Sequence, residues 1–159
     1  MTALANNPYI LSAEQIAAAG VPGNWPFGLR DFARSTDIDD YQHVNNGAYF
    51  AWFENVRTLY MQQLGDAYNG GTFVKHAVRL ANVDYAAPMY LHDDYVVVAR
   101  TDKVGRSSFE MTLEAWSNGT MCCRTTVLMI VVDDAAKKSM QIPDGIRQAM
   151  IDRDGAKIK

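Results

Sequence analysis

The sequence has few cysteines, and none of them is placed to cross-link distant segments. Its 159 residues include two cysteines, Cys122 and Cys123, which are adjacent. Neighbouring cysteines pair only with strain, and unpaired cysteines are typical of a reducing compartment. We therefore expect two free thiols and a cytoplasmic protein. A chain of this length buries roughly two thirds of its unfolded surface, so one apolar core can stabilise it without disulfides.

Positive charge and long apolar runs are also scarce. Fifteen Lys and Arg against 18 Asp and Glu give a net charge of −3, whereas nucleic-acid-binding proteins normally carry a basic face. The longest aliphatic run, residues 127–132, is far shorter than the ~20 residues that span a membrane. The N-terminal segment has neither the basic nor the apolar region of a signal peptide. We therefore expect neither nucleic acid nor membrane as a partner.

The composition is that of a globular protein, with 48% hydrophobic and 21% charged residues. Its length suits one domain. The first 28 residues are irregular, with a short helix over 13–19 that Ser12 can cap and Gly20 can end. We expect residues 1–28 to form an N-terminal arm and residues 29–159 to form the domain.

One long helix is predicted where apolar residues begin to recur at three- and four-residue steps. It should start at Asn45 or Asn46 and end at Gly65, giving ~18–20 residues. Aromatic side chains cover much of its circumference, so we expect burial on several sides. The residues that carry the pattern are Tyr49, Trp52, Phe53, Val56, Leu59, Tyr60 and Leu64.

Alternation with a period of two indicates strands in most of the remaining sequence. The expected strands cover residues 29–35, 74–85, 90–104, 107–116 and 121–132. Asn118-Gly119 between the last two predicts a type I′ hairpin, and Pro143 can open a terminal helix through Met150. This order predicts an α+β fold, with one helix on one face of an antiparallel sheet. Pairing between two copies would cover an open sheet edge.

Residues that can perform chemistry are densest in segment 37–47, directly before the long helix. A helix start offers free N–H groups and partial positive charge that can hold an oxyanion. One of the loop carboxylates can act there as base or nucleophile, and His43 can tune it or move a proton. The same residue types also serve as ordinary helix caps. Asp37, Asp39, Asp40 and His43 are potential metal ligands, but their spacing fits no standard zinc or EF-hand pattern.

These motifs resemble the hotdog-fold thioesterases of the 4-hydroxybenzoyl-CoA thioesterase and acyl-CoA thioesterase group. The similarity covers about residues 29–147. It rests on Asp-x-Asp at 37–39, His-Val-Asn-Asn at 43–46, Asp84-Tyr85-x-x-Pro88 and the turn 104–108. The resemblance implies a single hotdog domain with a long central helix wrapped by a curved sheet. It also implies a homodimer or a dimer-of-dimers tetramer, with strand 74–85 pairing across the dimer axis and active sites between subunits.

The resemblance also assigns roles within the site. Asp39 would be the catalytic base or nucleophile, and the backbone N–H of Asn46 would be the oxyanion donor, with Asn45 and Gly47 beside it. His43 matches a catalytic histidine of acyl-ACP thioesterases. The implied reaction is hydrolysis of an acyl-CoA, with no metal and no cofactor apart from the coenzyme A of the substrate.

Four further residues are candidates for substrate binding at the turn 103–108. The resemblance implies that Ser107 and Ser108 face the thioester or the pantetheine arm, and the basic side chains of Lys103 and Arg106 can bind phosphates of coenzyme A. Hydrogen bonding at a strand start and solvation in a turn are the ordinary alternatives for the serines and for the basic residues.

Three other functions fit part of the pattern. An acyl-ACP thioesterase is supported by residues 42–46, but Tyr41 stands where those enzymes have Asn, and Gln42 replaces the Gly of many bacterial relatives. A non-catalytic hotdog protein that binds acyl thioesters would not need both Asp39 and the Asn45-Asn46 helix start. A hotdog hydratase would need Asp-x-Asn-x-x-His, which is absent.

Overall fold

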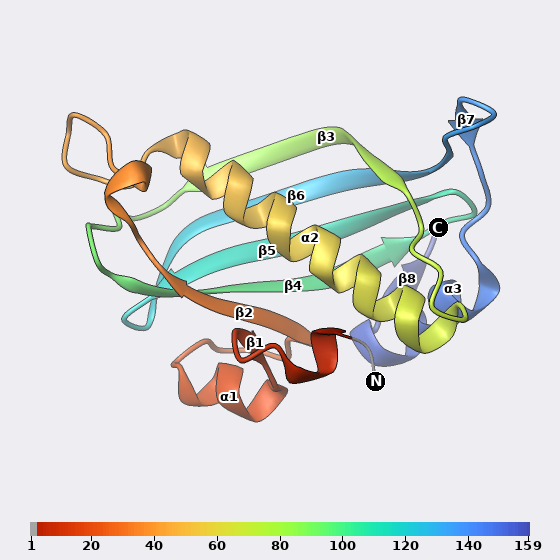
Figure 1. Cartoon of the computed structure of the whole chain (residues 1–159), viewed down its shortest axis with the longest axis horizontal. Coiled ribbons are helices and arrows are strands. Elements are labelled where there is room, and N and C mark those ends of the chain that lie inside the picture. Colours follow the sequence, from red (N-terminus) through yellow and green to blue (C-terminus); the bar gives the residue numbers. More distant parts are fainter. Residues whose placement is uncertain (1–2) are drawn as a thin grey trace.

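The molecule consists of one long helix lying across a curved sheet (Figure 1). A computed structural model describes residues 3–159. Its helices are α1 (Ala13–Ala18), α2 (Asn46–Tyr68) and α3 (Asp144–Asp154), with 3₁₀ turns at Ala3–Asn6 and Ser35–Asp37. Its strands are β1 (Ile10–Leu11), β2 (Phe27–Phe32), β3 (His76–Tyr85), β4 (Asp94–Val104), β5 (Ser108–Ser117), β6 (Thr120–Asp133), β7 (Lys138–Ser139) and β8 (Lys157–Ile158).

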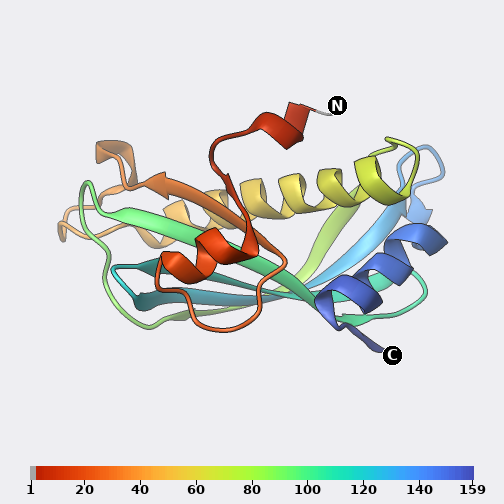
Figure 2. The same ribbon diagram turned by 90° about the horizontal axis from the view of Figure 1, so that it is seen from below.

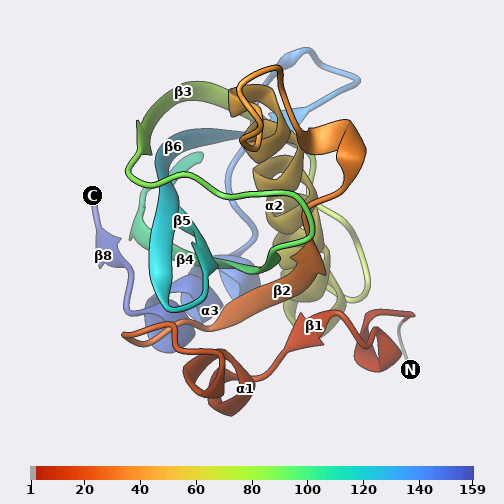
Figure 3. The same cartoon turned by 90° about the vertical axis from the view of Figure 1, so that its left-hand side faces the viewer.

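The main strands of the sheet follow the order β1-β2-β4-β5-β6-β3, and each pair of neighbours is antiparallel. Figure 3 shows this sheet curving around α2. Figure 2 shows α3 beside the C-terminal end of α2. The predicted α+β fold, with a central helix wrapped by an antiparallel sheet, is therefore confirmed.

The two faces of β4 contact different layers. Val97 and Ala99 belong to the large core around α2, whereas Val96 and Val98 pack against a smaller cluster formed with the N-terminal segment. Successive side chains of a strand point to opposite faces, which explains this division. The smaller cluster consists of Leu11, Ile16, Val21, Trp25, Val96 and Val98. The N-terminal segment thus covers the face of β4 that turns away from α2.

Helix α2 is longer than the sequence predicts, with 23 residues, and Gly65 is not its end. Gly65 lies inside the last turns, where a Cβ atom would stand 2.6 Å from the carbonyl oxygen of Thr72. The glycine therefore permits a close approach of the following loop rather than terminating the helix.

The expectation of burial on several sides is wrong for most of the helix, because its buried residues recur at three- and four-residue steps along one face while Phe50, Glu54 and Thr58 are exposed. The buried face widens in the last turns, where Met61 and Gly65 are also buried. Among residues 3–159, no helix combines the length and apolar character needed to cross a membrane.

Several element boundaries differ from the prediction by a few residues. Ser35 lies in a 3₁₀ turn rather than in the first strand. The strand expected from residue 90 starts at Asp94, because residues 90–93 form a turn in which His92 has a φ of 68°. Helix α3 runs past Met150 to Asp154.

Local turn and cap predictions are confirmed. Asn118 and Gly119 both have positive φ, 49° and 73°, as a type I′ hairpin requires. Ser12 caps α1, and its side chain accepts a hydrogen bond from the backbone of Gln15 at 3.3 Å. These features depend on neighbouring residues alone, which is why the sequence predicts them.

Candidate active site

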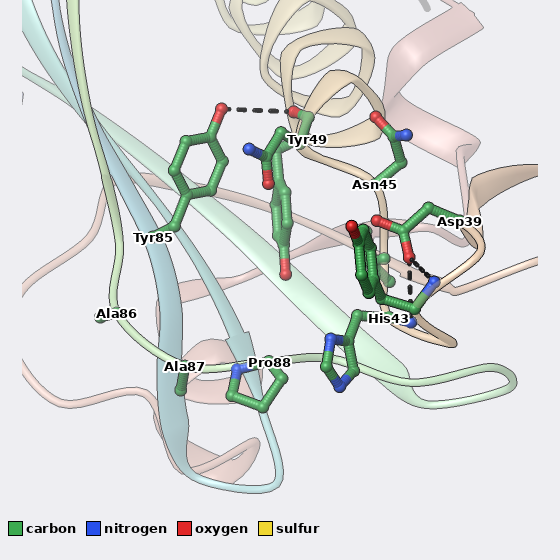
Figure 4. A pocket seen from close by; sticks show the side chains of 11 residues that line it. Asp39, His43, Asn45, Tyr49, Tyr85, Ala86, Ala87 and Pro88 are labelled. Carbon is green, nitrogen blue, oxygen red and sulfur yellow. Dashed lines mark hydrogen bonds between the residues drawn. The ribbon is translucent and has the colours of Figure 1, made fainter.

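A cavity of about 520 Å³ opens at the start of α2 (Figure 4). Three stretches of chain meet there: the loop before α2, the first turn of α2, and the segment that follows β3. The cavity is lined by Asp39, Tyr41, His43, Val44, Asn45, Asn46, Tyr49, Tyr85, Ala86, Ala87 and Pro88. The structure thus gathers the chemistry-bearing segment 37–47 around one hollow.

The loop before α2 is held by its own backbone. The Asp39 N–H donates to the carbonyl oxygen of His43 at 2.9 Å, and the Gln42 N–H donates to that of Asp39 at 3.0 Å. Gln42 has a φ of 65°, a region that favours glycine. Residues with a Cβ atom are strained at this φ, which is the physical reason why a glycine suits this position. The Asn45 N–H donates to the carbonyl oxygen of Asp37 at 2.7 Å and so joins the loop to the helix start.

The Asp39 carboxylate is oriented through one of its oxygens. Its Oδ1 accepts backbone hydrogen bonds from Tyr41 at 2.9 Å and His43 at 3.4 Å (Figure 4). No hydrogen bond to Oδ2 is formed by any residue in the range 3–159. The side chain is half-buried at the edge of the cavity. The carboxylate is thereby held in place while one oxygen stays free to act on a bound molecule.

The start of α2 presents one backbone N–H without an acceptor. Asn45 is the N-cap, and its Oδ1 accepts the N–H of Gly47 at 2.7 Å. The Ala48 N–H donates to the carbonyl oxygen of Asn45 at 2.9 Å. The Asn46 N–H has no such acceptor among the described residues, whereas that of Gly47 is occupied. Helix N-termini carry partial positive charge, so Asn46 is placed to hold an oxyanion.

The His43 ring lies in the same cavity but does not touch the Asp39 carboxylate. It packs edge-on against the ring of Tyr90, with centroids 5.3 Å apart. Figure 4 shows it directed toward Pro88 and away from Asp39. Within the described chain, no hydrogen bond or ion pair joins the ring to the carboxylate, and His43 bonds Asp39 through its backbone alone. The expectation that His43 tunes Asp39 is therefore not supported by a direct contact between the two side chains.

Lys103, Arg106, Ser107 and Ser108 lie at the other end of the sheet. Strand β4 connects the two ends of the sheet. Its first residue, Asp94, pairs with Phe32, which precedes the Asp39 loop, and its last residue, Val104, precedes the turn to β5. Eleven strand residues separate these ends, or roughly 35 Å. Lys103 also forms an ion pair with Glu110 at 3.1 Å. Within one chain, these four predicted binding residues do not reach the cavity, so a role for them would require a second copy.

The segment after β3 forms one wall of the cavity. In the sequence, the motif Asp84-Tyr85-x-x-Pro88 was the only indication of this wall. The Tyr85 hydroxyl donates to the carbonyl oxygen of Asn46 at 3.4 Å and joins the end of β3 to the start of α2.

The potential metal ligands in the loop before α2 do not come together as one site. Across residues 3–159, no group of three or more His, Cys, Asp or Glu side chains is placed to hold a metal ion.

Comparison with known proteins places this geometry among thioesterases. Residues 33–150 match the thioesterase-like superfamily. A thioesterase-superfamily structure from Jannaschia sp. CCS1 is 26% identical and covers 96% of this chain and 99% of its own, with a TM-score of 0.86. A thioesterase from Thermus thermophilus, solved with coenzyme A and Zn, is 26% identical and covers 80% of this chain and 98% of its own, with a TM-score of 0.68. No curated protein matches the sequence.

Proposed function

Because the chain belongs to the thioesterase-like superfamily, we propose that it hydrolyses an acyl-CoA thioester to a free acid and coenzyme A. One observation carries the proposal: the free oxygen of Asp39 and the unbonded N–H of Asn46 border the same cavity. A carboxylate and a helix-start N–H are the two groups that thioester hydrolysis needs.

In the proposed mechanism, the thioester carbonyl oxygen accepts the Asn46 N–H. Asp39 removes a proton from a water molecule, whose oxygen attacks the carbonyl carbon. Negative charge then develops on the carbonyl oxygen, where the N–H and the partial charge of the helix stabilise it. Collapse of this intermediate breaks the C–S bond, and the proton held by Asp39 neutralises the departing thiolate.

A covalent route uses the same groups. Asp39 attacks the carbonyl carbon directly, the thiolate leaves, and water hydrolyses the resulting mixed anhydride. Both routes require Asp39 and the Asn46 N–H, and neither requires a metal or an organic cofactor. When water attacks the Asp39 carbonyl carbon of the anhydride, its oxygen stays in the Asp39 carboxylate, so label found there after a single turnover in labelled water identifies the covalent route.

Coenzyme A is favoured over acyl carrier protein as the thiol carrier. The Thermus relative was solved with coenzyme A, whereas the His43 ring lacks the contact with Asp39 that an acyl-ACP type of arrangement would use. The test is a thiol-release screen over short, aromatic and long acyl-CoAs, with acyl-ACP as comparator and a chelator in a parallel set. We expect turnover of an acyl-CoA that the chelator leaves unchanged. Absence of thiol release from every thioester would contradict the proposal.

His43→Ala should lower kcat/KM for the preferred acyl-CoA by less than about tenfold, since the loss of one wall contact is worth about 1 kcal/mol. The ring lines the cavity and packs on Tyr90 without bonding the carboxylate. Initial rates of thiol release measure the effect. A loss as large as that of removing the Asp39 carboxylate would instead favour the acyl-ACP type of mechanism.

We also propose that the working form is a homodimer or a dimer of dimers, joined through β3. This strand ends the sheet path and has no neighbour on its second side among residues 3–159. Val78, Leu80 and Tyr85 on it are 44%, 54% and 41% exposed. Open apolar edges favour pairing between chains. Sedimentation should give two or four times the 17.7 kDa of one chain, and an active monomer would contradict this.

We also propose a cytoplasmic location, which the two free, buried cysteines support.

A further inference from the structure

The hydroxyl of Tyr49 points from a buried ring into the cavity. Tyr49 is 3% exposed and lines the hollow beside Asp39. Figure 4 shows its hydroxyl directed away from the helix start, toward the wall formed by Ala87 and Pro88. No hydrogen bond to this hydroxyl is formed within the described range 3–159. The hydroxyl oxygen is not one of the fully buried polar atoms without a partner, so water in the cavity can reach it. A ligand that displaces this water has to supply an acceptor in its place.

The Tyr49 ring is held in a fixed orientation by three aromatic neighbours. Its centroid lies 5.1 Å from that of Trp52, 5.8 Å from that of Tyr85 and 6.4 Å from that of Phe53. The ring also stands on the first turn of α2, three residues after the Asn46 donor. The hydroxyl therefore keeps one position relative to the catalytic groups.

The hydroxyl remains a hydrogen-bond donor under ordinary conditions. Burial raises the pKa of Tyr49 far above its usual value, so the phenol stays protonated. Two other tyrosines line the cavity: the Tyr85 hydroxyl already donates to the carbonyl oxygen of Asn46, and Tyr41 is 82% exposed. Tyr49 is thus the buried tyrosine of the cavity whose hydroxyl is free to donate to a ligand.

A donor in this position discriminates between acyl groups. In this proposal the thioester carbonyl binds at Asn46 and the rest of the acyl group extends into the cavity along Tyr49. An unsubstituted alkyl chain would displace water from the hydroxyl and leave it unpaired, which costs free energy. An acyl group with a second oxygen would accept the hydrogen bond. Sites built to bond a polar group reject analogues that lack it.

We propose that Tyr49 is a specificity-determining residue that selects acyl thioesters carrying an oxo or hydroxyl oxygen beyond the thioester carbonyl. This proposal rests on the proposed acyl-CoA hydrolysis. The hydroxyl acts on substrate selection and takes no part in bond breaking, which remains with Asp39 and the Asn46 N–H.

The test compares matched pairs of acyl-CoAs of four to eight carbons, with and without one oxo or hydroxyl group at successive carbons. For one substituted member, the wild-type protein should show a kcat/KM about tenfold above that of its unsubstituted partner. Tyr49→Phe should remove this preference by raising KM for the substituted member, with kcat nearly unchanged. The same variant should leave the unsubstituted member unchanged or improve it.

Tyr68→Phe is the matched control, because it removes a hydroxyl from the exposed far end of the same helix. It should leave the preference unchanged. A second measurement titrates non-hydrolysable thioether analogues of one matched pair into Asp39→Asn, with and without Tyr49→Phe, and should show the same loss of preference in Kd.

Three outcomes overturn the inference. Wild-type protein that treats both members of every pair alike would show that the hydroxyl selects nothing. Tyr49→Phe that lowers both members of a pair by the same factor would show a packing role. Wild-type protein that hydrolyses no thioester and binds no analogue would overturn the proposed function together with this inference, whereas the first two leave hydrolysis itself standing.

Discussion

Asp39→Asn is expected to lower kcat for acyl-CoA hydrolysis by ~10³-fold while leaving the fold unchanged. The amide oxygen of Asn can still accept the backbone hydrogen bonds of Tyr41 and His43 that orient this side chain. It cannot take a proton from water or attack a carbonyl carbon. The change therefore removes the chemistry and keeps the geometry. Thiol release measures the loss, and circular dichroism with sedimentation confirms that fold and assembly persist.

Asp40→Asn provides the matched control for this variant. Asp40 is the adjacent carboxylate, it is exposed, and it is not among the residues that line the cavity. The same loss of one negative charge should change the rate by less than about tenfold. If Asp40→Asn lost as much activity as Asp39→Asn, the effect would come from loop charge rather than from a catalytic carboxylate. An Asp39→Asn protein with wild-type turnover would rule out the assigned mechanism.

The second large effect concerns stability, at the end of the molecule opposite the cavity. Asp154 closes α3, and its side chain is fully buried. Its Oδ2 accepts hydrogen bonds from the Tyr60 hydroxyl of α2 and from the Thr101 N–H of β4, at 2.5 and 2.7 Å. Its Oδ1 pairs with Arg153 Nε at 2.8 Å. One carboxylate thus joins α3 to both the central helix and the sheet.

Asp154→Ala should lower the free energy of unfolding by about 3 kcal/mol. Removing the carboxylate leaves the Thr101 N–H and the half-buried Arg153 guanidinium without their partner. Unpaired buried donors and charges account for most of such losses. Equilibrium urea unfolding, monitored by tryptophan fluorescence, measures the change. Below the unfolding transition, thiol release should stay near the wild-type rate, because the cavity lies at the other end of α2.

Asp152→Ala is the control on the same helix. Asp152 is exposed, and its carboxylate accepts a hydrogen bond from Gln148 at 2.8 Å within α3. Its removal should cost less than about 1 kcal/mol, as is usual for surface positions. Equal losses from the two variants would show that the Asp154 hydrogen bonds add nothing specific to the attachment of α3.

The site illustrates where prediction from sequence works and where it stops. Asp39, His43, Asn45 and Asn46 fall within eight residues, so local spacing is enough to place them together before a helix. Whether a nearby side chain touches another depends on rotamers and packing. The His43 ring turned toward Tyr90 and not toward Asp39, although the two residues are four apart in the chain.

The amino-acid sequence alone determines the α+β order, the Asn45 cap, the hairpin at Asn118-Gly119 and the loop that holds Asp39. Each of these depends on the period of apolar residues or on groups a few residues apart, and such short-range rules act before the chain packs. Other features required the packed chain. Packing set Gly65 against Thr72, and it carried the turn 103–108 to the far end of the sheet. It also brought the wall 85–88 to the helix start, where the Tyr49 hydroxyl faces a cavity that exists only once segments distant in sequence have packed together.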